Sequence, residues 1–252
     1  MGLLKTVTFE KQTPVSGLSI LDFMNEPALF LNNVEVEDRE AFEAFATNNQ
    51  VISYLDYDGR PSFEFKGTTI DEVAPHFDGI SASNPKKMPE WLVFWAQEEV
   101  DQGGGGAYIV HDCTSIGKDS ELMGQLSGGR QVFVDYQKSV SGASAQDEFS
   151  IPLIQEKYGK PCLRMFLDPS DEAERQTPKP NTRLQDSKGN CLEHLRPRIH
   201  ELMRHPQNVS AVELKRRGIL ILNNHLCFHG RMRLNEASSR SFCRVQLLST
   251  PK

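Results

Sequence analysis

The order of hydrophobic and polar positions predicts a strand followed by a helix near the start of the chain. Residues 28–34 are Ala-Leu-Phe-Leu-Asn-Asn-Val, a short apolar run of the kind that forms a buried strand. From residue 38 to residue 47 the spacing changes, and Phe42 and Phe45 lie three positions apart, as on one face of a helix. Asp38 is a residue type that caps helix N-termini through its carboxylate. We therefore expect a strand at 28–34 and a capped amphipathic helix at 38–47.

The middle and the end of the chain carry mostly strand patterns. From residue 51 to residue 65, apolar and polar residues interleave around Asp58-Gly59, a dipeptide typical of tight hairpin turns. One later segment is helical instead, because apolar residues recur at helical spacing from 192 to 203, with Pro197 as an interruption or a first-turn residue. Further strands are predicted at 91–95, 107–110, 218–228 and 241–248. The pattern therefore predicts an α+β protein that is mainly β.

Residues 168–190 differ in composition from the rest of the chain. This stretch contains Pro169, Pro178 and Pro180 together with many charged side chains, which favours a surface segment over a core element. No internal repeat and no long linker divides the sequence, and 252 residues are enough for one hydrophobic core. We expect a single domain over residues 1–252, with a lid or an insertion at 168–190.

Composition and charge argue against several classes of protein. No apolar run approaches the ~20 residues that a transmembrane helix needs. The 28 basic and 34 acidic residues give a formal net charge of −6 without a dense basic stripe, which argues against a nucleic-acid partner. The five cysteines are an odd number without C-x-x-C spacing, a pattern that favours the reducing cytoplasm over a disulfide framework or a zinc site. We expect a cytoplasmic protein that binds neither nucleic acid nor a membrane, and its oligomeric state stays open.

One histidine has a carboxylate two positions on, in His76-Phe77-Asp78. On a strand, residues i and i+2 point to the same face, so the two side chains can converge on one ion. By chance alone, about one such H-x-[DE] is expected in a chain with this composition. A second histidine, His229, ends an apolar strand far downstream. Two histidines and one carboxylate on one face of an ion are the facial triad of non-haem Fe(II) oxygenases.

Several motifs occur together in one order along the chain. They are the strand and helix at 28–47, His76-Phe77-Asp78-Gly79, Pro89 to Trp95, the glycine-rich turn and strand from Gly103 to Asp112, and Asn223-Asn224 through His229-Gly230-Arg231. In these motifs the sequence resembles the TauD/clavaminate-synthase-like branch of the Fe(II)- and 2-oxoglutarate-dependent oxygenases, over roughly residues 28 to 248. The resemblance implies a double-stranded β-helix core, a jelly roll of the cupin kind, with flanking helices. It also implies His76, Asp78 and His229 as iron ligands, with 2-oxoglutarate and O2 as co-substrates.

The same resemblance implies which residues hold 2-oxoglutarate. Arg240 stands 11 residues after His229, at the position where the family pairs an arginine with the distal carboxylate, and a guanidinium suits this role because it binds a carboxylate through two hydrogen bonds. Arg244 lies four residues later and is expected to help hold the co-substrate or to bind an anionic group of the substrate. Tyr108 stands where many relatives carry a Thr or Ser that contacts 2-oxoglutarate. Because Asp78 is present, the halogenase variant of this chemistry is disfavoured.

The resemblance implies oxidation of a C–H bond, with hydroxylation as the default outcome and release of succinate and CO2. We expect a small amino-acid-like or specialised-metabolite substrate, with Arg231, Lys66 and Asn84 as candidate substrate contacts. Two alternatives stay open: a jelly-roll binding or sensor protein without turnover, and an oxygenase of the same fold that acts on a protein or peptide. A third and remote alternative is a hydrolase with Cys113 as its nucleophile.

Overall fold

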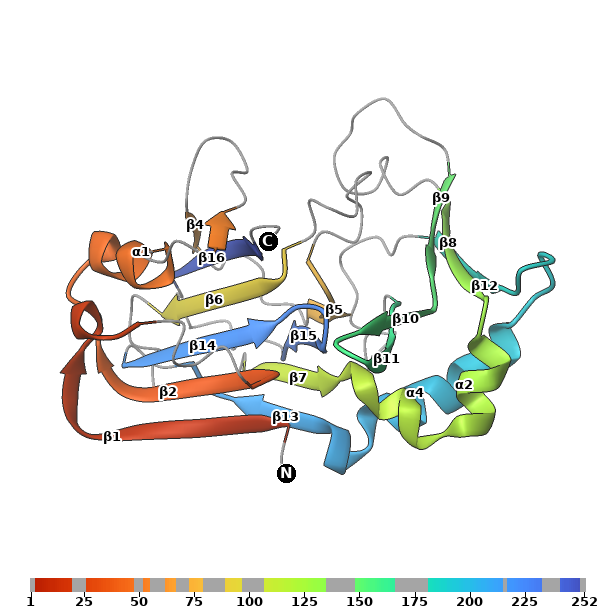
Figure 1. Ribbon diagram of the computed structural model, residues 1–252, viewed down its shortest axis with the longest axis horizontal. Helices are drawn as coiled ribbons and strands as arrows, with labels where there is room; N and C mark the ends of the chain where they lie inside the picture. Colours follow the sequence, from red (N-terminus) through yellow and green to blue (C-terminus); the bar gives the residue numbers. More distant parts are fainter. Residues whose placement is uncertain are drawn as a thin grey trace.

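The computed structural model describes eleven stretches of the chain, and all structural statements below concern these residues. They are residues 3–19, 26–47, 52–54, 62–66, 73–78, 89–96, 107–134, 148–165, 181–214, 217–232 and 241–249. Most of the described elements are strands (Figure 1), as the sequence predicts.

The largest sheet has seven strands, six of them in the order β1-β2-β14-β6-β16-β3, with β4 also paired to β16. Its strands are β1 (Leu4–Pro14), β2 (Ala28–Glu35), β3 (Ile52–Tyr54), β4 (Ser62–Lys66), β6 (Trp91–Ala96), β14 (Gly218–Asn223) and β16 (Ser241–Ser249). All six residues of β6 and all six of β14 are buried. Continuous burial means that both faces of these central strands are covered, which explains why their sequences are unbroken apolar runs instead of alternating ones.

The two faces of this sheet are covered by different partners. On one face, Trp95 of β6 packs against Phe42 of helix α1 (Arg39–Thr47), with the ring centroids 5.4 Å apart. On the other face, Leu92 and Phe94 belong to a core that also contains Val110 and residues of a second sheet. That sheet has the order β13-β7-β15-β5 and consists of β5 (Val73–His76), β7 (Tyr108–Asp112), β13 (Val209–Val212) and β15 (Cys227–Arg231). The main core therefore lies between two sheets.

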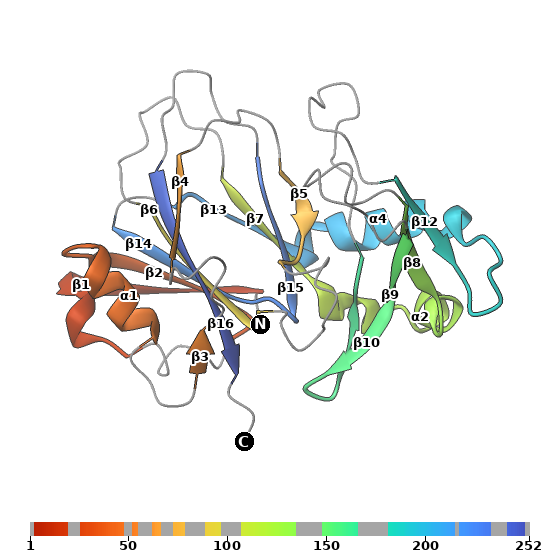
Figure 2. The same ribbon diagram turned by 90° about the horizontal axis from the view of Figure 1, so that it is seen from above.

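The remaining elements form a second group beside the two sheets (Figures 1 and 2). A three-stranded sheet has the order β12-β8-β9, and β10 and β11 form a hairpin. The strands are β8 (Arg130–Val134), β9 (Glu148–Pro152), β10 (Ile154–Lys157), β11 (Lys160–Leu163) and β12 (Asn181–Gln185). The helices of this group are α2 (Ser120–Leu126) and α4 (Arg196–Arg204), with short 3-10 turns at Cys113–Lys118, Glu193–Leu195 and Pro206–Asn208. A further 3-10 turn, Val15–Gly17, directly follows β1.

Two helix predictions are confirmed in their details. Helix α1 begins after Asp38, whose carboxylate accepts a hydrogen bond of 2.7 Å from the main-chain N–H of Ala41, as expected of a capping residue. In α4, Pro197 lies in the first turn, where its missing N–H costs no helical hydrogen bond. The strands predicted at 28–34, 91–95 and 107–110 are present as β2, β6 and β7.

The predicted hairpin around Asp58-Gly59 is wrong. Strands β3 and β4 do not pair with each other in the described residues; both pair antiparallel with β16, at Leu247–Ser249 and at Ser241–Val245 respectively. They therefore run in the same direction, one after the other along one partner strand. The Asp58-Gly59 pattern is a local feature of the sequence. The pairing of β3 and β4 instead depends on β16, which lies far along the chain.

One further strand prediction needs correction. The apolar stretch 218–228 is not one strand, because residues 224–226 form a turn between β14 and β15, which belong to different sheets. The lid or insertion expected at 168–190 stays a prediction; the described part of this segment contains strand β12, which pairs with β8 over its whole length. Its residues 168–180 lie outside the described residues. The charged and polar side chains of β12 fit a strand because it lies at the edge of a small sheet.

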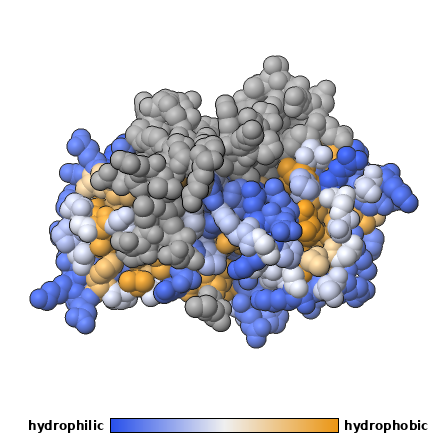
Figure 3. All heavy atoms as spheres, viewed as in Figure 1, coloured by the Kyte–Doolittle hydropathy of each residue, from blue (hydrophilic) through white to orange (hydrophobic). Residues whose placement is uncertain are grey.

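Figure 3 shows the face seen in Figure 1, where hydrophobic groups alternate with larger hydrophilic areas over the described part of the surface. Within the described residues, no helix has the length and apolar character that crossing a membrane requires.

Candidate metal centre

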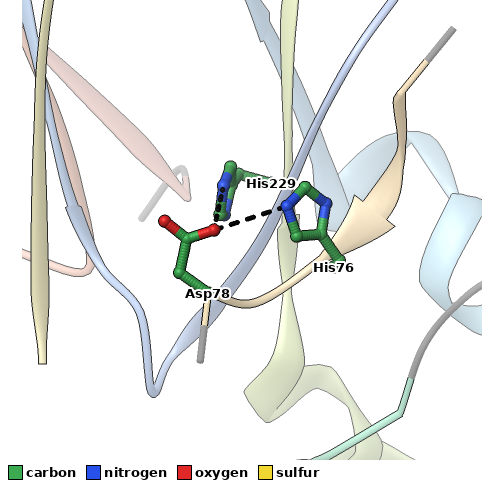
Figure 4. Close-up of side chains that lie close together, drawn as sticks. All are labelled: His76, Asp78 and His229. Carbon is green, nitrogen blue, oxygen red and sulfur yellow. Dashed lines mark ion pairs between the residues drawn. The ribbon is translucent and has the colours of Figure 1, made fainter. Parts of the chain in front are cut away.

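Three side chains meet between the two large sheets. His76 is the last residue of β5, Asp78 follows two positions later, and His229 is the middle residue of β15. The two histidines face each other directly across the β5–β15 pair, with their ring centroids 4.5 Å apart. Figure 4 shows that the three side chains point toward one another. The structure thus brings together the three residues that the sequence analysis predicts as metal ligands.

The distances among these side chains suit a common ion. Oδ1 of Asp78 lies 3.5 Å from Nε2 of His76 and 3.7 Å from Nε2 of His229, and the three ligand atoms all lie within 4.8 Å of one another. Metal–ligand bonds of about 2.0–2.2 Å place pairs of ligand atoms roughly 3–4 Å apart. Two imidazole nitrogens and one carboxylate oxygen are also the donor set of the non-haem Fe(II) facial triad. The residues present therefore fit a divalent transition metal.

The route by which Asp78 reaches this position differs from the prediction. His76 and Asp78 were expected on one face of a strand, but β5 ends at His76 and Asp78 lies in the turn that follows. The side chains converge because the chain bends after the strand. The position of Asp78 must therefore be fixed by contacts other than strand pairing.

Burial and neighbouring charges set the protonation of the two buried candidate ligands, Asp78 and His229. Burial opposes the charged form of Asp78, but Arg244 and the two histidines outweigh it and hold the pKa of the carboxyl well below its usual range. Burial, followed by the influence of His76, lowers the pKa of His229 to about 3. At neutral pH the site therefore contains an ionised Asp78 and a neutral His229, which are the forms that bind a metal.

Arg244 lies beside the same carboxylate. Its strand, β16, runs next to β6, and Arg244 is in register with Phe94. Nη1 of Arg244 donates to Oδ2 of Asp78 at 2.6 Å, whereas Oδ1 faces the two histidines. Arg244 was expected to contact the co-substrate or the substrate. In the structure its guanidinium binds the carboxylate of Asp78, a candidate metal ligand, and leaves Oδ1 on the side of the two histidines.

Two other predicted residues lie close to the triad. The ring of Tyr108 packs against Phe94 at a centroid distance of 5.1 Å, and Phe94 in turn lies 5.7 Å from the ring of His229. Arg231 follows His229 by two positions on β15 and is buried, in register with Tyr108. Both residues are thus on the face of β7 and β15 that carries His229.

Three predicted residues cannot be placed in the site. Arg240 and Asn84 lie outside the described residues. The main chain of Lys66 pairs with Ser241 at the end of β4, but its side chain also lies outside the described part.

Two buried residues next to the triad, Asn224 and Arg164, were not predicted as part of the site. Asn224, in the turn between β14 and β15, is fully buried and hydrogen-bonds to the main chain of Asp78. Arg164, after β11, is also buried, and its guanidinium lies 3.7 Å from the ring centroid of Phe77. Both residues are polar and interrupt an apolar run of the sequence, and this interruption is the feature that could have identified them.

Two further histidines and Cys113 lie outside the triad. Nδ1 of His111 lies 2.9 Å from the carbonyl oxygen of Met203. His225 is buried outside the triad, and burial, followed by Arg164 and Lys157, lowers its pKa to about 3. Burial raises the pKa of the Cys113 thiol well above its usual value, so Cys113 is a poor nucleophile.

Comparison with known proteins gives matches among solved structures alone. No protein-family model and no curated protein sequence matches the chain. The fold is similar to that of PvcB from Pseudomonas aeruginosa, with a TM-score of 0.73 and 16% identity over 98% of this chain and 88% of that one. A second structure of PvcB, described as an Fe, alpha-ketoglutarate dependent oxygenase from an isonitrile synthetic pathway, gives a TM-score of 0.71 at 16% identity and the same coverage.

A taurine dioxygenase from Burkholderia xenovorans is similar as well, with a TM-score of 0.67 and 12% identity over 98% of this chain and 88% of that chain. The similarity extends over nearly the whole length of each protein, although few residues are identical. The chain therefore has the fold of the Fe- and alpha-ketoglutarate-dependent oxygenases.

Proposed function

We propose that this protein is a non-haem Fe(II)- and 2-oxoglutarate-dependent dioxygenase with a jelly-roll core. The observation that carries the proposal is the convergence of His76, Asp78 and His229 between two sheets, in a fold shared with enzymes of this class. Either feature alone would be weaker, because exposed acidic groups are common without a metal and one fold supports many functions. Here the ligand set of the class occurs in the fold of the class.

Each residue of the site has a definite task in this proposal. His76, Asp78 and His229 would hold Fe(II), which supplies activation of O2 for the oxidation when bound. Arg244 keeps Asp78 ionised and occupies Oδ2, so that Oδ1 is presented to the ion. Arg240 would pair with the distal carboxylate of 2-oxoglutarate, since a guanidinium stays charged when enclosed. Tyr108 would border the co-substrate from the face that it shares with His229.

The substrate is proposed to be a small amino-acid-like molecule or a specialised metabolite in the cytoplasm. Two of the similar structures are small-molecule oxygenases by their descriptions, one from an isonitrile pathway and one a taurine dioxygenase. We propose an anionic group on the substrate because Arg231 is a buried cation on the same strand face as His229. Lys66 and Asn84 remain candidate contacts. The proposed outcome is hydroxylation, in which O2 and 2-oxoglutarate yield succinate, CO2 and one oxygen atom inserted into a C–H bond.

Spectroscopy followed by turnover tests the proposal. Anaerobic addition of Fe(II) and 2-oxoglutarate should produce a weak visible charge-transfer band. The His76→Ala variant should lose the band at any co-substrate concentration, whereas Arg240→Ala should recover it when 2-oxoglutarate is raised. Succinate release that requires both Fe(II) and O2 would then identify substrates from a panel of small acids. A band without any succinate release, even with candidate substrates, would favour a sensor, and the absence of a band would refute the assignment.

A further inference from the structure

The main chain of Asp78 is held by a side chain and not by a β-ladder. The last paired residue of β5 is His76, opposite His229, so Asp78 lies beyond the hydrogen bonds that fix a strand. Its main-chain N–H instead donates to Oδ1 of Asn224 at 2.9 Å, and its carbonyl oxygen accepts from Nδ2 of Asn224 at 3.0 Å. Both main-chain groups of this one residue are thus satisfied by one carboxamide.

The carboxamide of Asn224 is itself fixed. Its Nδ2 also donates to the carbonyl oxygen of Pro89 at 2.8 Å, so both amide protons and the oxygen are used. Its main-chain N–H donates to the carbonyl oxygen of Glu90 at 2.8 Å, and its carbonyl oxygen accepts from Nη1 of Arg164 at 3.3 Å. Asn224 is fully buried, and a buried network with its groups satisfied is rigid because any break leaves an unpaired polar group.

Phe77, between the two ligands, is held from the same side. Its ring lies under the guanidinium of Arg164 at 3.7 Å and stacks on Phe228 at a centroid distance of 5.8 Å. Phe228 directly precedes His229 on β15. Arg164 therefore contacts both Asn224 and Phe77. The turn that presents Asp78 is supported by Arg164, which follows β11, by Phe228 of β15, and by the carbonyl oxygen of Pro89 before β6.

From these contacts we propose that Asn224 is a positioning residue of the metal centre. Its carboxamide sets the main chain of Asp78 so that Oδ1 reaches the point shared by the two histidines. The inference rests on the proposed function, because it assigns a role to Asn224 in metal binding by the triad. Its hydrogen bonds go to main-chain atoms of Asp78 and Pro89, so it acts through Asp78. Loss of such an outer contact typically weakens metal affinity about 10- to 100-fold.

Equilibrium binding of Co(II), followed by its visible spectrum under conditions where each variant is folded, tests this role. Asn224→Ala removes the three side-chain hydrogen bonds. Asn224→Asp keeps the size and the acceptor for the Asp78 N–H but loses both donated bonds. Asn208→Ala is the matched control, because Asn208 is also buried, donates to the carbonyl oxygen of Leu202 at 2.8 Å and accepts from Lys118 at 2.8 Å, away from the triad. All three should lower the unfolding temperature.

The expected result is a loss of Co(II) affinity of about tenfold or more in both Asn224 variants, with Asn208→Ala unchanged. If Asn224→Ala folds only at low temperature, the test uses Asn224→Asp instead, and its Co(II) affinity is measured at the same temperature as that of Asn208→Ala. Unchanged affinity in a folded Asn224 variant, or an equal loss in Asn208→Ala, would overturn the inference while leaving the proposed function intact. Failure of the unmodified protein to bind Co(II) would instead overturn the metal centre itself.

Discussion

Gly230 of β15 lies close against the backbone of β5, and the substitution Gly230→Ala tests whether this close approach positions the triad. A Cβ built on Gly230 would lie 2.6 Å from the carbonyl oxygen of Val73 and 3.1 Å from the nitrogen of Pro75. The pairing of β5 with β15 is irregular at this point, with a register shift between the His229 and Arg231 pairs. The extra residue on β5 forms a bulge around Pro75. Proline fits this edge strand because it has no main-chain N–H that would need a partner.

The size of the effect follows from the geometry. The contact of the new Cβ with the Val73 oxygen is about 0.8 Å shorter than ordinary van der Waals contact. Both obstructing groups belong to the backbone, so β5 must move as a unit, and overpacking of this kind costs about 1–3 kcal/mol. Because β5 ends at His76, the shift separates His76 from His229. Metal sites tolerate deviations of only about 0.2 Å in ligand distance, so we expect a loss of metal affinity of at least tenfold.

Urea unfolding of the metal-free protein and Co(II) titration measure the two effects. Gly124→Ala is the control, because Gly124 lies in helix α2 with no atom within 4 Å of its Cβ position; it should stabilise the protein by up to about 1 kcal/mol. The reasoning is refuted if Gly230→Ala binds Co(II) as tightly as the unmodified protein, or if its stability matches that of Gly124→Ala.

Three further substitutions have definite expected outcomes. Arg244→Met leaves the buried Asp78 carboxylate without its guanidinium, so the metal-free protein should lose about 3 kcal/mol and gain more in unfolding temperature from added Co(II) than the unmodified protein does; an unchanged unfolding temperature would contradict this. His225 is neutral in the folded state because its pKa is lowered to about 3 from 6.5, so the unfolded chain binds one more proton between these values. Stability should fall by about 1.4 kcal/mol per pH unit for this residue as the pH drops below 6.5, and His225→Gln should remove that part of the slope in urea unfolding between pH 7 and pH 5; an identical slope would show that the residue titrates normally. Cys113→Ala should retain full turnover, because its thiol is buried with a raised pKa; loss of turnover in a folded variant would revive the cysteine-hydrolase alternative.

Elements whose pattern reflects burial alone could be predicted from the sequence. Strand β6 is an unbroken apolar run because one face meets α1 and the other meets the second sheet. Helix α1 was predictable because its apolar spacing and its cap at Asp38 are both local features. The candidate ligands His76, Asp78 and His229 could also be named in advance, since the order of motifs along the chain resembles that of a known oxygenase family, and the structure brings the three side chains together.

The features that escaped prediction depend on contacts between distant segments. The Asp58-Gly59 signal could not show that β3 and β4 pair with β16, because strand pairing is decided by the partner. The turn at 224–226 interrupts an apolar stretch. The polar side chain of Asn224 in this turn is buried because it hydrogen-bonds to the main chain of Asp78, which lies far away in the sequence. Likewise, the spacing of Arg244 gave its strand but not its partner, the carboxylate of Asp78.

The central claim is that three side chains distant in the sequence bind one divalent ion. Anaerobic equilibrium dialysis with Fe(II) measures this directly, on the unmodified protein and on His76→Ala, Asp78→Ala, His229→Ala and the control His225→Ala. The account predicts one Fe(II) per chain for the unmodified protein and for His225→Ala, and a loss of binding for each of the other three. Equal binding by the unmodified protein and by the folded triad variants would contradict it.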